Sequence, residues 1–170
     1  MATSAERDAG TRLPALGSRG QGWVAGQMLL IFLEGLVRYP SFDALPPASA
    51  AGWLSFGVGA ALFAVGGWVA YRGIDALGPN LSALPAPVAD GELVVTGIYR
   101  RVRHPIYAGV TGVALGWAFF VVSPAALVVA LTLAGWLDLK SRREEAWLVA
   151  RYPGYAAYRE GTARFVPRLY

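Results

Sequence analysis

Four long apolar segments take up a large part of this 170-residue chain and strongly limit what it can fold into. Each approaches the roughly 20 residues that an α-helix needs to cross a bilayer. Only 15% of the residues are charged and mean hydropathy is +0.43, whereas about a quarter of the residues of a soluble domain are charged. The sequence therefore predicts an all-α integral membrane protein with about four transmembrane helices. The predicted spans are residues 22–37, 52–71, 106–122 and 124–139.

The third and fourth segments meet at Ser123-Pro124 with no charged residue near the junction. Proline at a helix start loses nothing by lacking an N–H group, so this junction predicts a tight helical hairpin. The alternative is one long helix kinked at Pro124. Beyond the fourth span, the chain is expected to continue as an amphipathic cytosolic helix to Arg151, ended by the following Pro-Gly pair.

The N-terminal residues 1–20 are polar, and they lack the apolar core and cleavage site of a signal peptide. We predict that they form a flexible tail in front of a single domain over residues 21–170. Within that domain, the loop 72–105 and the C-terminal segment 140–170 are the long polar parts. A short helix is expected around residues 155–162 of the C-terminal segment.

The basic residues indicate the orientation of the chain. The two loops expected outside the cytoplasm contribute only Arg38, and the other cations flank the opposite ends of the spans. By the positive-inside rule, both termini and the central loop are predicted to be cytoplasmic, in a multi-pass protein of a bacterial-type cytoplasmic membrane. The cations on the cytoplasmic side include Arg7, Arg12, Arg19, Arg72, Arg100, Arg101, Arg103, Lys140, Arg142, Arg143 and Arg151.

Composition also excludes several kinds of site. The chain has no cysteine, which rules out disulfides and thiolate chemistry. Its single histidine leaves little for a metal, so no metal site is predicted. The net charge of +4 could suggest nucleic acid, but the cations gather beside apolar segments as membrane flanks do, so no nucleic-acid partner is predicted.

Two ionisable clusters flank the predicted hairpin. Arg103, His104 and Tyr107 stand where the central loop meets the third apolar segment, and Glu144 and Glu145 follow the fourth. Ionisable groups at membrane depth are costly unless they are paired or used, so these residues are site candidates. Because the hairpin returns the chain to the cytosol, both clusters are expected in one site. A cation, a carboxylate pair and an aromatic ring suit a zwitterionic amino acid moiety.

Four sequence blocks stand in the second half of the chain. They are Leu93-Val94-Val95-Thr96-Gly97-Ile98-Tyr99, Arg103-His104-Pro105-Ile106-Tyr107-Ala108-Gly109, Glu144-Glu145-Ala146-Trp147-Leu148 and Tyr152-Pro153-Gly154-Tyr155-Ala156-Ala157-Tyr158. In order and spacing they resemble a family of integral membrane methyltransferases that includes isoprenylcysteine carboxyl methyltransferases and phospholipid methyltransferases. The resemblance covers about residues 93–167.

The resemblance implies S-adenosylmethionine as methyl donor and S-adenosylhomocysteine as product. The donor would bind a cytosol-facing pocket formed by the loop 72–105, the ends of the last two spans and the segment 140–170. The residues implied in catalysis are His104, Tyr107, Glu144 and Glu145. Those implied in donor binding are Leu93, Val94, Gly97, Tyr99, Arg103, His104, Pro105, Tyr107, Gly109, Glu144, Glu145, Tyr155, Tyr158 and Arg164.

The chain departs from the family pattern at two places. Where many members carry arginine four residues before the glutamate pair, this chain has Lys140, which offers a point charge rather than a bidentate fork. Tyr152-Pro153 replaces the phenylalanine-glycine that follows the pair in the family. The chain is also predicted to have fewer spans than the larger relatives.

The acceptor implied by the resemblance is lipophilic and reaches the site from the bilayer, with either a carboxylate or an amine as nucleophile. A carboxylate needs no base, whereas an amine must first lose a proton, for which Glu144, Glu145 or His104 could serve. The rival hypothesis is a four-span transporter or scaffold without catalysis. In that case Glu34 in the first span would be the coupling group.

Overall fold

The structure, a computed structural model, describes residues 13–37 and 49–167, and within these residues it is helical with no β-strand. This confirms the predicted all-α class for the part described. A single parallel bridge joins Val102 to Ala163. The helices are α2 (Gln21–Leu36), α3 (Ala50–Leu77), α4 (Pro105–Phe120), α5 (Pro124–Arg151) and α6 (Tyr155–Gly161), with short 3-10 helices η2 (Gly78–Asn80) and η3 (Gly97–Arg100).

Two of the described helical stretches, Ala50–Asn80 and Pro124–Arg151, are long and apolar enough to cross a membrane. Helix α4 is apolar but has only 16 residues. Large apolar side chains are exposed along α2 and α3, including Leu29, Phe32 and Leu54. An apolar surface of this extent is typical of a region that contacts other apolar matter rather than water. Together these features indicate a membrane protein.

The predicted hairpin is present, and the kinked-helix alternative is wrong. Helix α4 ends at Phe120, and α5 begins at Pro124, where proline occupies the first helical position. The Ser123 side chain accepts a hydrogen bond from the N–H of Ala126 at 3.2 Å and so caps the new helix. The chain reverses through Val122, whose φ of 49° lies in the left-handed region. Helices α4 and α5 then pack against each other.

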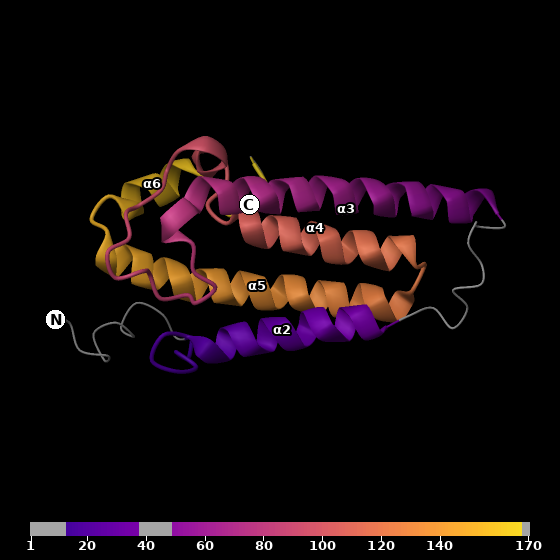
Figure 1. The fold of residues 1–170 in the computed structure, drawn as a ribbon, viewed down its shortest axis with the longest axis horizontal. Coiled ribbons are helices and arrows are strands. Elements are labelled where there is room, and N and C mark those ends of the chain that lie inside the picture. Colours follow the sequence, from indigo (N-terminus) through magenta and orange to yellow (C-terminus); the bar gives the residue numbers. More distant parts are fainter. Residues whose placement is uncertain (1–12, 38–48, 168–170) are drawn as a thin grey trace.

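The four long helices lie side by side in the order α2, α5, α4, α3 (Figure 1). Helices α3 and α4 make the closest contact, because glycines let their backbones approach. A Cβ on Gly66 would lie 2.7 Å from the carbonyl oxygen of Gly109, and one on Gly59 would lie 2.7 Å from that of Gly116. In each helix these glycines are seven residues apart, so they face the partner on every second turn. We call this contact the glycine seam.

Helix α3 continues past the predicted span end at Tyr71 as far as Leu77. Gly78, with a φ of 49°, and Pro79 then end it. Helix α5 likewise runs without interruption from Pro124 through the predicted cytosolic stretch to Arg151. The ends of both helices therefore project beyond the apolar part of the bundle and carry the loop between η2 and η3.

The remaining predictions on the N-terminal half fall partly outside the described residues. Of the predicted tail, residues 1–12 are not described, whereas Pro14 accepts a hydrogen bond from the Trp23 indole at 3.1 Å. Glu34 is buried on α2, and neither of its carboxyl oxygens has a hydrogen-bond partner among the described residues. Arg38, a basic residue four positions further along the chain, lies outside them.

Candidate active site

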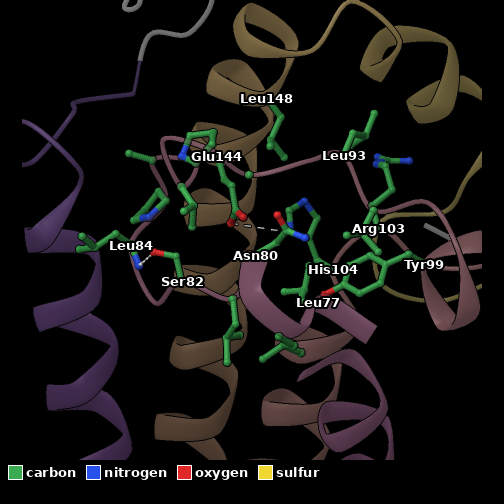
Figure 2. Close-up of a pocket in the computed structure, with 18 of the residues that line it drawn as sticks. Leu77, Asn80, Ser82, Leu84, Leu93, Tyr99, Arg103, His104, Glu144 and Leu148 are labelled. Carbon is green, nitrogen blue, oxygen red and sulfur yellow. Dashed lines mark hydrogen bonds and ion pairs between the residues drawn. The ribbon is translucent and has the colours of Figure 1, made fainter. Parts of the chain in front are cut away.

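A cavity of about 320 Å³ lies at the end of the bundle where the loop 78–104 covers the ends of α3, α4 and α5 (Figure 2). Ile74 and Leu77 of α3 and Leu148 of α5 give it apolar walls, while Gln27 is the contribution of α2. Pro85, Pro87 and their neighbours form the covering loop. The polar and aromatic residues of the lining include Asn80, Ser82, Tyr99, Arg103, His104, Tyr107, Lys140, Glu144, Tyr152, Tyr155 and Tyr158.

The two clusters predicted to share one site do lie together. The Tyr107 hydroxyl donates a hydrogen bond of 2.7 Å to Glu144 Oε2, and His104 Nδ1 lies 3.9 Å from the same oxygen. His104 also stacks on the Tyr107 ring, with 5.3 Å between ring centroids and 6° between planes. Figure 2 shows the His104 ring and the Glu144 carboxylate turned toward each other, with a dashed line between them. Helix α5 positions the carboxylate, and the first turn of α4 positions the two rings.

The two adjacent glutamates have different surroundings. Glu144 lines the cavity with 24% of its side chain exposed, whereas Glu145 is 3% exposed and does not line it. Glu145 Oε1 accepts a hydrogen bond of 2.9 Å from Arg103 Nε and lies 3.2 Å from His104 Nε2. Its other oxygen lies 3.2 Å from Arg164 Nη2. Neighbouring helical positions point about 100° apart, so one glutamate faces the cavity and the other faces the cations behind it.

The cations around Glu145 control its ionisation. Burial alone would raise the pKa of this carboxyl, but the hydrogen bonds and positive charges of His104 and Arg103 outweigh burial and lower the pKa to about 2. Glu145 is therefore a carboxylate at neutral pH. It serves as the fixed negative centre that holds Arg103, His104 and Arg164, which come from the loop and the C-terminal segment.

The C-terminal segment closes the site from behind through backbone contacts. The Arg103 guanidinium donates to the carbonyl oxygens of Arg159, at 2.9 Å, and of Thr162. The backbone N–H of Arg103 donates to Ala163 and that of His104 to Arg164, at 2.9 and 3.0 Å. This pairing explains the parallel bridge and fixes the position from which α4 starts.

Tyrosines form one side of the cavity. The Tyr158 hydroxyl donates to the carbonyl of Tyr99 at 2.6 Å, and the Tyr155 and Tyr158 rings meet edge to face at 5.7 Å. Burial, with the charge of Glu145 and against that of Arg103, raises the pKa of Tyr158 to about 12. Burial likewise raises the pKa of Tyr155, whose hydroxyl has no hydrogen-bond partner among the described residues. These phenols remain protonated and act as donors and aromatic walls.

Most of the predicted donor-binding residues line the cavity, and the others lie around it. Gly97 has a φ of 59° and begins η3. Pro105 is buried as the first residue of α4. Gly109 belongs to the glycine seam, where a Cβ would lie 2.5 Å from the backbone N of Ala70. Arg164 joins Glu145 to Asp138, with 3.1 Å between Nη1 and Oδ1. The predicted residues in the lining are Leu93, Val94, Tyr99, Arg103, His104, Tyr107, Glu144, Tyr155 and Tyr158.

Several lining residues were absent from the sequence-based site. Lys140 lies one helical turn before Glu144, and this spacing places both side chains on one face of α5. This four-residue spacing is the sequence signal from which Lys140 could have been predicted as a site residue. Gln27 had no such signal, because it reaches the site only through the packing of α2 on α5. The loop residues 81–88 also line the cavity, and the path of this loop could not be predicted from the local sequence alone.

Comparison with protein families agrees with this picture. The family model described as phospholipid methyltransferase matches residues 54–154, which is more than half of the chain. The protein therefore belongs to a class of methyltransferases. More particularly, it belongs to the phospholipid methyltransferase family. A search of curated proteins gives no match. The matched region runs from α3 to the residue before α6, so Gln27, Tyr155, Tyr158 and Arg164 lie outside it.

Proposed function

We propose that this protein transfers a methyl group from S-adenosylmethionine to a lipophilic acceptor that reaches the cavity from the bilayer. The observation that carries the proposal is the Glu144 carboxylate, which faces the cavity between Tyr107 and His104. A carboxylate among aromatic rings is suited to a cationic group. The family match supports methyl transfer as the reaction class.

The cavity residues fit such a donor. The volume of about 320 Å³ falls at the lower end of the range for small-molecule sites. The Tyr155 hydroxyl is buried in the lining without a partner among the described residues, so it can donate to a ligand. Glu144 retains Oε1 to accept from an ammonium group, because Tyr107 engages Oε2. Leu93, Val94 and Leu148 provide apolar contacts for the rest of a ligand.

When bound, the donor supplies a methyl group that its sulfonium already activates. The protein then has to orient the nucleophile and exclude water, which together can lower the barrier by several kcal/mol. Tyr107 holds the Glu144 carboxylate in place, and His104 is fixed between Glu145 and the Tyr107 ring. An amine acceptor must lose its proton to a group of the cavity wall, for which His104 or Glu144 could serve, while a carboxylate acceptor needs no base.

The proposal is tested by binding and turnover in detergent. Isothermal titration of the purified protein with S-adenosylhomocysteine is expected to show one site. Donor with a labelled methyl group is then incubated with the protein and membrane lipid extracts, and label is expected in the lipid fraction. Glu144→Gln should lower both affinity and turnover by at least about tenfold, the effect of losing one charge-assisted contact. Absence of donor binding in a folded sample would contradict the proposal.

We also propose that α2, α3, α4 and α5 all lie in the membrane, with both termini and the cavity on the cytoplasmic side. The 16 residues of α2 and of α4 rise only about 24 Å, so their flanking residues would complete the crossing. The absence of cysteine allows a direct test, because single cysteines can be introduced without background. An impermeant maleimide should label Ala125→Cys in intact cells and Glu160→Cys only after lysis. The reverse pattern would contradict this orientation.

A further inference from the structure

Lys140 has an unusual environment for a buried cation. Its side chain is 1% exposed and belongs to the cavity lining. The ammonium donates to Gln27 Oε1 at 2.6 Å and to the carbonyl of Ala83 at 3.1 Å, and it lies 4.9 Å from the centre of the Tyr107 ring. All of these contacts are electrically neutral.

Arg103, the arginine of the lining, is compensated by a carboxylate, because its Nε lies 2.9 Å from Glu145 Oε1. No carboxylate of the described residues lies within 4.0 Å of the Lys140 ammonium. A buried charge is costly unless a counter-charge accompanies its hydrogen bonds. Lys140 therefore leaves positive charge on the cavity wall that an anionic ligand group can neutralise.

The geometry favours a ligand that carries both charges. An ammonium group has three N–H donors, and two of them are engaged by Gln27 and Ala83. Glu144 follows one helical turn later, at about 5–6 Å between Cβ atoms. Tyr107 contacts both residues, with its ring toward Lys140 and its hydroxyl toward Glu144. The wall thus presents a cation and an anion side by side.

We propose that Lys140, held by Gln27, forms a subsite for an anionic oxygen group of the ligand whose cationic group lies at Glu144. This inference rests on the proposed function, and it names the chemical group of the ligand that Lys140 would recognise. Carboxylate and phosphate oxygens share the required chemistry. The carboxylate would come from the amino acid part of the methyl donor, and the phosphate from the headgroup of a phospholipid acceptor. Through Gln27, helix α2 also takes part in this subsite, although the family match does not cover α2.

The test compares Lys140→Met with Arg100→Met, which removes an exposed positive charge without touching the cavity. The first arm titrates S-adenosylhomocysteine and 5′-methylthioadenosine, which lacks the amino acid carboxylate. If the subsite holds the donor, Lys140→Met should weaken S-adenosylhomocysteine by about 10- to 100-fold and leave methylthioadenosine unchanged.

The second arm titrates short-chain phosphatidylethanolamine and the matching diacylglycerol into protein in detergent. If the subsite holds the lipid phosphate, Lys140→Met should remove the preference for the phospholipid and leave S-adenosylhomocysteine binding intact. Arg100→Met should behave as wild type in both arms. Equal affinities of Lys140→Met and wild type for all four probes would overturn the subsite.

Two further controls keep the outcomes distinct. Should Lys140→Met unfold, Lys140→Gln removes the charge while retaining a hydrogen-bond donor, and the same losses are expected. Lys140→Arg keeps the charge and should bind within a few-fold of the wild-type affinity. If Lys140 had a purely structural role, its substitution would weaken all probes alike. Failure of the wild-type protein to bind S-adenosylhomocysteine would count against the proposed function, and the lipid arm would still decide on the subsite.

Discussion

The glycine seam and the cavity end of the bundle achieve close packing in opposite ways. In the seam, α3 and α4 touch through backbone because Gly66 and Gly109 have no side chain to separate them. At the cavity end, long charged side chains span the space between segments, as Arg103 and Arg164 do to reach Glu145. The seam therefore tolerates no added atoms, and the cavity end tolerates no lost charge. Stability depends on both, but only the cavity end offers groups for chemistry.

The largest effect is expected from breaking the charge network. Glu145→Gln leaves the nearly buried Arg103 side chain facing a neutral amide and leaves Arg164 with Asp138 as its carboxylate partner, which should lower the free energy of unfolding by about 3 kcal/mol. Its neighbour provides the matched control, since Glu144→Gln loses one hydrogen bond at the partly exposed cavity wall and should cost under about 1 kcal/mol. Thermal unfolding in detergent measures both. Equal destabilisation of the two variants would contradict the separation of roles.

The seam is tested by adding one methyl group. A Cβ on Gly66 would lie 2.7 Å from backbone atoms of α4, so Gly66→Ala should cost about 2 kcal/mol through overpacking. Gly67→Ala adds the same methyl group where no atom lies within 4 Å. It should stabilise α3 by about 0.5–1 kcal/mol, the helix preference of alanine over glycine. A neutral Gly66→Ala would show that the helices do not approach this closely.

The pH dependence of stability should follow Glu145. Its pKa is lowered from 4.5 to about 2 in the folded protein, so the unfolded chain binds the proton more readily. The stabilisation from this group is present above about pH 4.5 and is lost as the pH falls from there toward 2. Unfolding temperatures measured across that interval should drop for wild type and drop less for Glu145→Gln. Parallel pH curves would mean that another group controls acid unfolding.

The smallest effect on stability is expected at Glu34, which lies near the end of α2 that is away from the cavity. Glu34 is buried with no partner for its carboxyl oxygens among the described residues. Glu34→Leu should therefore raise stability by about 1 kcal/mol and leave methyl transfer unchanged, because an unpaired polar group is costly to bury. Thermal unfolding and turnover are measured on the same preparation, with Glu34→Gln as control. Loss of methyl transfer in both variants would contradict this prediction and would give Glu34 a part in the reaction.

The sequence allowed the helices and the hairpin to be predicted because apolar length, Ser123-Pro124 and the charge distribution are local signals. The sequence also predicted that His104 and Tyr107 lie close to the glutamate pair, because a helical hairpin places its two open ends side by side. Helix geometry predicts that one of the two adjacent glutamates faces the site, but the sequence did not decide between Glu144 and Glu145, because that depends on how α5 rotates against α4. The contribution of Gln27 was not predictable either, since it arises from helix packing between segments far apart in the chain.

The continuity of α5 has a consequence for the depth of the reaction. Twenty residues separate Pro124 at its start from Glu144, and at 1.5 Å per residue this is a rigid rise of about 30 Å, the thickness of a bilayer core. In the proposed membrane arrangement, this unbroken helix sets the cavity carboxylate at the level of the lipid headgroups. A single residue inserted between Val128 and Leu133 would lift that carboxylate by only about 1.5 Å but turn it by about 100°, away from its aromatic neighbours.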